Sequence, residues 1–195
     1  MDTLMRSVQK QAGFGLVEVL VTLIIVAVGL LGAASLQLLS KRSNYDAAQR
    51  TTAAHLGQDL LERMRSNPSA LINYMQDGTL GGGTLGIAPP VACTDATVCT
   101  PEELAAYDLW QWEQSLDGAM ELQDGVEAGG LAGAQACVRG PVFGASGTYE
   151  IVIAWRGMTE LVDPAADDCG SASGNYGNDN AYRRILVVRT FINAT

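Results

Sequence analysis

Residues 14–36 read FGLVEVLVTLIIVAVGLLGAASL, and the apolar run that they begin reaches Leu39. At a rise of ~1.5 Å per residue, a helix of this length crosses the ~30 Å hydrocarbon core of a bilayer. Its only ionisable side chain is that of Glu18. The stretch therefore predicts a membrane-spanning helix with one carboxylate near its start.

Glu18 needs a partner if it lies inside a membrane. A carboxylate at the centre of a membrane helix costs roughly 2.5 to 3.5 kcal/mol and is retained mostly where it meets a specific partner. If the chain were cut after Gly13, the new amino group of Phe14 would lie one helical turn from Glu18, or beside the Glu18 of a neighbouring chain. One residue thus predicts both processing and self-assembly.

The same residues carry a family resemblance. The short basic start with Arg6 and Lys10, the Gly13-Phe14 junction, Glu18 and the apolar helix resemble the class III signal of type IV prepilins. The following stretch, GLLGAASLQLLSKRSNYDAAQRTTAAHLGQDLLERMRSNP at residues 29–68, resembles the PilV-type minor pilins of that family.

The resemblance implies roles for individual residues. A prepilin peptidase would cut after Gly13 and methylate the amino group of Phe14, and Glu18 would dock the subunit against the N-terminus of its neighbour. Two positions depart from the family pattern, because Gly15 stands where Thr is usual and Ser35 where major pilins often carry Pro. Neither departure affects the cut.

Two simpler interpretations compete for the N-terminal segment. An ordinary secretory signal could be cut at Gly32-Ala33-Ala34, although it would leave Glu18 unexplained within the apolar region. An unprocessed membrane anchor is the other alternative. The positive-inside rule does not decide between orientations, because cations flank the run on both sides.

Helical periodicity continues beyond the apolar run. Apolar and small residues recur at steps near three and four up to Asn67-Pro68, which ends the helix. The positions assigned to this stripe are Leu36, Leu39, Ser43, Ala47, Thr51, Ala54, Leu61 and Met64. The predicted organisation is a leader at 1–13, a transmembrane or filament-core helix at 14–39, an amphipathic continuation at 40–67 and a globular head domain at 68–195.

The head domain is predicted to be small and of mixed structure. Residues 69–98 are rich in Gly and Pro and predict loops, and Thr100-Pro101-Glu102-Glu103 predicts a capped helix start. Three strands are expected at 136–139, 148–155 and 184–192, with Tyr149, Ile151, Ile153 and Trp155 facing the long helix. The predicted fold is α+β: a pilin-like ladle whose long N-terminal helix packs on a small antiparallel sheet, with a second short helix and disulfide-closed loops.

Four cysteines behind an export signal indicate an oxidising compartment and disulfide bonds. Three connectivities are possible, and the local pairs Cys93 with Cys99 and Cys137 with Cys169 are favoured. A zinc site would need the same four residues, but no Cys-x-x-Cys spacing is present.

A polar stretch follows Cys169 and is the candidate partner surface. Residues 170–180 read GSASGNYGNDN and hold too few apolar residues to build core. The candidate surface residues are Asp163, Asp167, Asp168, Asn175, Tyr176 and Asp179. The acidic members could also bind calcium, although the spacing of an EF-hand is absent and no metal site is predicted.

Composition limits the classes of function. The chain has a formal net charge of −9, and loss of residues 1–13 would leave 10 basic and 20 acidic side chains. Such a surface disfavours nucleic-acid binding, which needs clustered Lys and Arg. With His55 as the one histidine and the cysteines in disulfides, no catalytic set can be assembled, so the sequence predicts a non-enzyme without a cofactor.

The resemblance implies a structural minor subunit of a type IV pilus, anchored in the inner membrane with its head in the periplasm and then placed in the extracellular pilus, near the tip. It would help to prime filament assembly and so serve adhesion and twitching motility. Its expected partners are the prepilin peptidase, the inner-membrane assembly platform, the major pilin, other minor pilins and a tip adhesin-like protein. Two alternatives stay open: a minor pseudopilin of a type II secretion system, and a membrane-tethered module that recognises calcium or sugar through the loop at 163–180.

Overall fold

The computed structural model describes residues 13, 15–76, 78–94, 97–119, 122–123, 126–127, 129–161 and 167–194. The leader residues 1–12, Phe14 and Asp163 lie outside the described residues. The chain divides into two compact units, Met1–Ser43 and Asn44–Thr195. We call the second the head unit.

Helix α1 (Leu16–Ser66) supplies residues to both units. It ends just before Asn67-Pro68, as predicted, because Pro68 has no N–H to continue the helix. Its buried residues are Ala53, Gly57, Leu60, Leu61 and Met64. The predicted stripe is therefore partly wrong: Leu61 and Met64 are buried, whereas Ala47 and Thr51 are exposed. The buried face of α1 includes the small residues Ala53 and Gly57. A prediction based on the spacing of apolar side chains gives little weight to such small residues.

A buried polar network joins the end of α1 to the two helices that follow. These are α2 (Leu71–Tyr74), reached through a 3-10 turn at Pro68–Ala70, and α3 (Pro101–Asp117). The Asn67 side-chain amide donates to the carbonyl of Pro101 over 2.7 Å, and the Tyr74 hydroxyl donates to Asp108 over 2.6 Å. Because buried polar groups need partners, these bonds fix how the three helices meet.

Helix α3 begins as its sequence predicts and ends at a glycine. Thr100 and Glu103 form a reciprocal capping box around Pro101. Gly118 closes the helix in the left-handed region at φ 77°, and a Cβ there would lie 2.0 Å from the backbone of Gly129, so only glycine fits.

The main sheet has three antiparallel strands in the order β3-β4-β5, with β4 in the centre. Their bounds are Gln135–Arg139, Gly147–Arg156 and Arg183–Ile192. All three were predicted; β4 extends one residue beyond both of its predicted ends, and β3 and β5 each begin one residue earlier than predicted. A two-stranded hairpin of β1 (Leu122–Gln123) and β2 (Val126–Glu127) was not predicted.

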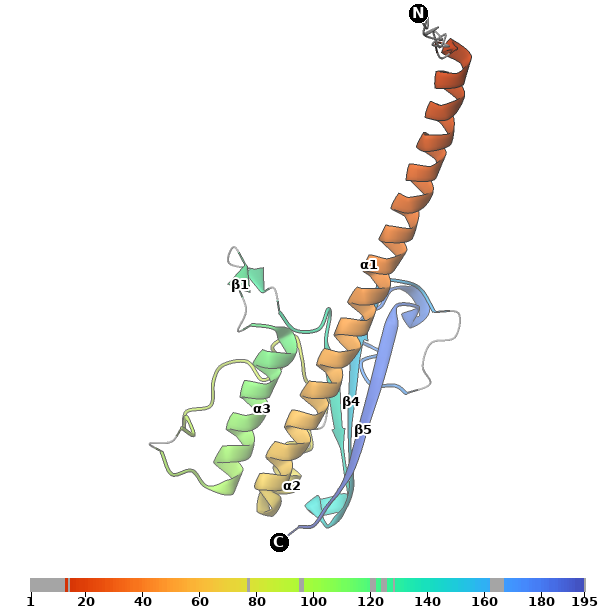
Figure 1. Cartoon of the computed structure of the whole chain (residues 1–195). Helices are drawn as coiled ribbons and strands as arrows, with labels where there is room; N and C mark the ends of the chain where they lie inside the picture. Colours follow the sequence, from red (N-terminus) through yellow and green to blue (C-terminus); the bar gives the residue numbers. More distant parts are fainter. Residues whose placement is uncertain are drawn as a thin grey trace, which may run out of the picture. The chain divides into compact units, whose positions relative to one another are not determined.

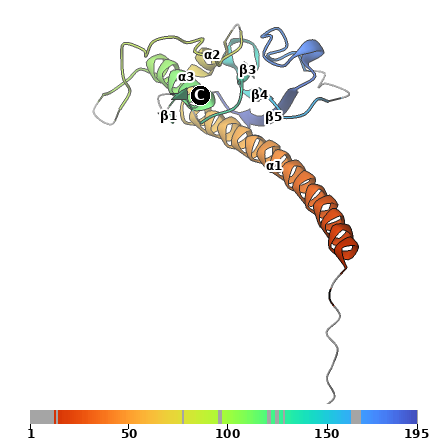
Figure 2. The ribbon, with the colours of Figure 1, turned by 90° about the horizontal axis from the view of Figure 1, so that it is seen from above.

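The head-unit portion of α1 packs on one face of the sheet, beside α3 (Figures 1 and 2). A Cβ on Gly57 would lie 2.8 Å from Val188 Cγ2, so the glycine leaves room for the side chain of Val188 on β5. The indole N–H of buried Trp112 donates to the carbonyl of Leu56 over 2.8 Å and ties α3 to α1. Tyr149, Ile151, Ile153 and Trp155 are all buried on β4, as predicted.

The opposite face of the sheet is also covered. Val152 and Ala154 are fully buried, and the disulfide between Cys137 and Cys169 brings the following loop onto this face. A second disulfide joins Cys93 to Cys99. The predicted α+β pilin-like fold is confirmed: a long N-terminal helix, a small antiparallel sheet, additional short helices and two disulfides.

Candidate functional site

The expected cleavage junction lies just before α1 begins. Gly13 is exposed, and no atom lies within 4 Å of the position that a Cβ would take. The backbone N–H groups of Glu18 and Val19 both donate to the carbonyl of Gly15, over 3.0 and 3.3 Å. These bonds start the first turn, and a carboxylate in this turn is stabilised by the helix dipole.

The first part of α1 exposes a continuous apolar surface. Every residue from Leu16 to Leu39 is exposed, and the most apolar window has a mean hydropathy of 2.7. The Thr22 hydroxyl donates to the carbonyl of Val19 over 2.8 Å, and the Ser35 hydroxyl donates to that of Leu31 over 3.0 Å. These two hydroxyls therefore satisfy their hydrogen bonds inside the helix, as an apolar environment requires.

Glu18 differs from these hydroxyl residues. Within the part of the chain that the structure describes, its carboxylate has no hydrogen bond or ion pair. Since a lone carboxylate on an apolar helix calls for a cation from elsewhere, this residue is the chemically distinctive point of the exposed helix.

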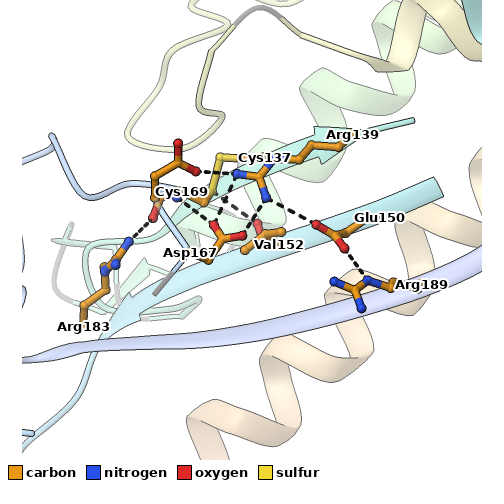
Figure 3. Close-up of polar contacts among 9 residues, drawn as sticks. Cys137, Arg139, Glu150, Val152, Asp167, Cys169, Arg183 and Arg189 are labelled. Atoms are coloured by element: carbon orange, nitrogen blue, oxygen red, sulfur yellow. Dashed lines mark hydrogen bonds and ion pairs between the residues drawn. A yellow bond between two sulfur atoms is a disulfide. The ribbon is translucent and has the colours of Figure 1, made fainter. Parts of the chain in front are cut away.

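Arg139 organises a second polar site, on the head unit beside the disulfide between Cys137 and Cys169 (Figure 3). Its guanidinium donates to both oxygens of Asp167, over 2.6 and 3.2 Å, to Asp168 over 2.6 Å and to Glu150 over 3.3 Å. Glu150 also accepts from Arg189. The bidentate bond from Arg139 lowers the pKa of Asp167, and the N–H of Cys169 contributes in the same direction.

The described residues of the candidate partner surface differ in burial and in hydrogen-bond partners. Asp167 and Asp168 bond Arg139, whereas Asn175 and Asp179 are exposed further along the loop. Tyr176 corrects the prediction, because it is completely buried and its hydroxyl donates to the carbonyl of Gly133 over 2.9 Å. The loop after Cys169 therefore contributes an aromatic residue to the core.

The acidic residues of this loop do not form a calcium site in the described region. Among the described residues, no three acidic, histidine or cysteine side chains gather as metal ligands would. The carboxylates of Asp167 and Asp168 already share the guanidinium of Arg139.

Sequence reasoning missed two carboxyl groups that hold the glycine-rich loop. Glu113, fully buried on α3, accepts from the backbone N–H groups of Gly81, Thr84 and Leu85 over 2.8 to 2.9 Å. Asp117, one turn later, accepts from Gly82 over 2.8 Å and Gly83 over 3.0 Å. The backbone N–H groups of this loop thus bind two carboxylates of the same chain, those of Glu113 and Asp117. The signal in the sequence was an acidic pair four residues apart on a helix that otherwise packs into the core.

Two family models match adjoining parts of the chain. The prokaryotic N-terminal methylation motif matches residues 8–34, and the type IV pilin Tt1218 family matches residues 35–110. No curated protein and no solved structure gives a significant match. The methylation motif covers the Gly13 junction, Glu18 and most of the exposed apolar stretch of α1, and the pilin match follows it directly and ends within α3. Over residues 8–110 the chain is thus similar to type IV pilins, a family of structural, non-enzymatic proteins.

Proposed function

We propose that this pilin is a minor subunit of PilV type, which helps to prime assembly of a type IV pilus and of its tip complex. One observation carries the proposal: the exposed apolar surface of α1 holds one carboxylate, Glu18, without a partner in the described chain. The resemblance of residues 29–68 to PilV-type minor pilins supports the minor role.

The apolar part of α1 serves two environments in this proposal. Before assembly, the helix lies in the inner membrane with the head in the periplasm, and the prepilin peptidase cuts after Gly13 and methylates Phe14. The assembly platform then moves the subunit into the filament, where the same surface packs against helices of the major pilin and other minor pilins. Glu18 pairs with the amino group of Phe14 on a neighbouring chain, which offsets the cost of a carboxylate among apolar side chains. Near the tip, the subunit meets an adhesin-like protein.

Substitution of Glu18 tests this role. We expect Glu18→Ala to leave the amount of protein in the membrane unchanged, since the carboxylate makes no hydrogen bond or ion pair in the described chain, while surface fibres fall at least tenfold. Thr22→Ala is the matched control, because Thr22 lies one turn later and bonds only its own helix. Fibres at the normal level in the Glu18→Ala strain would contradict the proposal. If the Glu18→Ala strain made normal fibres but lost type II secretion, the chain would belong to a secretion system instead.

The junction can be tested separately. Gly13→Leu meets no steric obstacle within the described chain, because no atom lies within 4 Å of the Cβ position. Any failure of processing in this variant therefore reports on recognition by the peptidase. We expect an unprocessed chain, longer by 13 residues, in immunoblots of the membrane fraction.

A further inference from the structure

We propose that a cavity in the head unit is a binding site for a carboxylate that another molecule supplies. The cavity has a volume of about 250 Å³ and lies between α1 and the adjoining ends of β4 and β5. Its lining residues are Asp46, Ala47, Arg50, Trp155, Arg184 and Ile185. The inference goes beyond the proposed function, because it concerns the head unit alone and does not depend on which machine the chain serves.

Two residues of the lining carry buried hydrogen-bond donors that lack an acceptor. The indole N–H of Trp155 and the Nη1 group of Arg184 are both buried, and neither has a hydrogen-bond partner in the described chain. Trp155 and Arg184 lie opposite one another on neighbouring strands, which places both side chains on one face of the sheet. Because a buried donor without an acceptor is costly, the cavity calls for an acceptor from outside.

The guanidinium of Arg184 is held in place by other contacts. Its Nη2 group donates to the carbonyl and to the hydroxyl oxygen of Thr159, over 2.8 and 3.0 Å. A Cβ on Gly157 would lie 2.7 Å from Cζ of Arg184, so the guanidinium lies directly against the backbone of this glycine. These contacts fix the group and leave Nη1 without an acceptor, as a preorganised binding site requires.

Asp46 also lines the cavity but does not supply the missing acceptor. Its Oδ1 atom accepts from the backbone N–H of Met158 over 3.1 Å, and its Oδ2 atom lies 3.9 Å from Nη2 of Arg184. Neither oxygen bonds the indole of Trp155 or Nη1 of Arg184. The carboxylate of Asp46 therefore ties α1 to the turn after β4, and the two buried donors remain unsatisfied.

The charge of the lining favours a singly charged acceptor. Arg50 is exposed and makes no hydrogen bond or ion pair with any residue that the structure describes. Two guanidinium groups and one carboxylate, those of Arg50, Arg184 and Asp46, give the lining a formal charge of +1. One carboxylate balances this charge, whereas a phosphate dianion exceeds it. The two oxygens of a carboxylate can accept from both guanidinium groups and from the indole N–H.

The remaining lining suits an apolar stem behind the carboxylate. Ala47, Ile185 and the ring carbons of Trp155 are apolar, and small-molecule sites typically combine such walls with a few polar groups. A carboxylate on a short apolar stem is the chemistry of an acidic side chain of another protein and of a small free carboxylic acid. The site recognises this shared chemistry, and the experiments below separate the two sources.

The first experiment is an NMR titration of the full chain in detergent at neutral pH, with butyrate as the probe. The chain has three tryptophans, and Trp155→Phe identifies the indole N–H signal of Trp155. We expect butyrate to move this signal to higher frequency until it saturates, because the N–H gains a charged acceptor. The signal of Trp112 should not move, because its N–H already donates to the carbonyl of Leu56.

Two variants show whether the response belongs to the cavity. Arg50→Gln removes a guanidinium that has no partner in the described chain, so the unfolding temperature should stay unchanged while the butyrate concentration at half-saturation rises about tenfold. Arg42→Gln removes an exposed cation of the same helix that does not line the cavity, and it should change neither quantity. Butyramide, which has the shape of butyrate without its charge, should move the Trp155 signal only weakly.

Carbodiimide crosslinking in native membranes identifies the source of the carboxylate. Arg50→Lys keeps the positive charge and provides an amine, which carbodiimide joins directly to a carboxylate in contact with it. An amide between residue 50 and an acidic side chain of another protein would show a protein source. A small acid joined to residue 50 would show a free ligand.

Several results would overturn the proposal. They are an unmoved Trp155 signal, an equal response to butyramide, and an unchanged half-saturation after Arg50→Gln, since water alone would then satisfy the donors. A crosslink only to Asp46 of the same chain, or no crosslink, would show that no other molecule supplies a carboxylate. Normal fibres after Glu18→Ala would leave the NMR response in place, so the two proposals fail separately.

Discussion

Glu18 and Glu113 both place a carboxyl group on a helix with many apolar residues, and they differ in their hydrogen-bond partners. Glu113 accepts bonds from Gly81, Thr84 and Leu85 within its own chain, whereas Glu18 has no partner in the described chain. A buried acceptor that is satisfied internally specifies a local structure. An unsatisfied carboxylate on an exposed apolar helix instead calls for a partner molecule, which is why we assign a structural role to Glu113 and propose an assembly role for Glu18.

Replacement of Glu113 measures its structural contribution. Glu113→Gln keeps the shape but turns an amide N–H₂ toward backbone donors, so we expect a loss of about 2 to 4 kcal/mol in the free energy of unfolding. Asp117→Asn is the comparison, because Asp117 bonds the same loop from a more exposed position and should cost about 1 kcal/mol. Urea denaturation of the full chain in detergent gives both values. A loss at residue 113 no larger than that at residue 117 would contradict the assignment.

The ion pair of Asp167 with Arg139 predicts a pH dependence. Arg139 lowers the pKa of Asp167 in the folded chain below its unfolded value of about 3.9. The pair therefore stabilises fully above about pH 4, and this contribution is lost as the pH falls through the lower, folded pKa.

We expect Asp167→Asn to cost about 1 kcal/mol at pH 7, a modest value because the pair is partly exposed. The difference from the unchanged chain should shrink as the pH falls below about 4. Thermal unfolding at a series of pH values checks this, with Asp179→Asn, an exposed acid of the same loop, as the control. A difference that is constant between pH 7 and pH 3 would show that the carboxylate charge is not what stabilises the loop.

At the scale of elements, the sequence predicted most of the fold because the signals were local. The capping box at Thr100, the stop at Asn67-Pro68 and the β-branched runs of the three strands each depend on a few neighbouring residues. The failures depended on contacts across the fold. The buried face of α1 depends on Gly57, whose lack of a side chain matters only because Val188 lies opposite. Tyr176 was assigned to the surface because a single aromatic residue in a polar loop gives no periodic pattern, whereas it is buried in the fold.

Gly57 tests how closely α1 and β5 must approach. A Cβ there would lie 2.8 Å from Val188 Cγ2, so Gly57→Val forces the helix and strand apart. We expect a loss of about 2 kcal/mol, because overpacking costs about 1 to 3 kcal/mol and the gain in helix propensity is a few tenths. Gly29→Val, where nothing lies within 4 Å, should leave the unfolding temperature of the head unchanged. An unchanged free energy for Gly57→Val would mean that the contact yields without cost.

At the scale of the whole molecule, the two units differ in the features that they carry. The exposed apolar helix of the first unit and the matching methylation motif concern export, processing and assembly. The head unit is closed by two disulfides, Cys93 with Cys99 and Cys137 with Cys169.

The most direct test of the central claim is the N-terminal sequence and intact mass of the protein purified from its native membrane. The pilin assignment predicts a chain that begins at Phe14 and carries one methyl group on its amino nitrogen. A chain that still begins at Met1, or one cut within Gly32-Ala33-Ala34, would contradict it, because Glu18 would then either lack the amino group that it is proposed to bind or be removed from the mature protein.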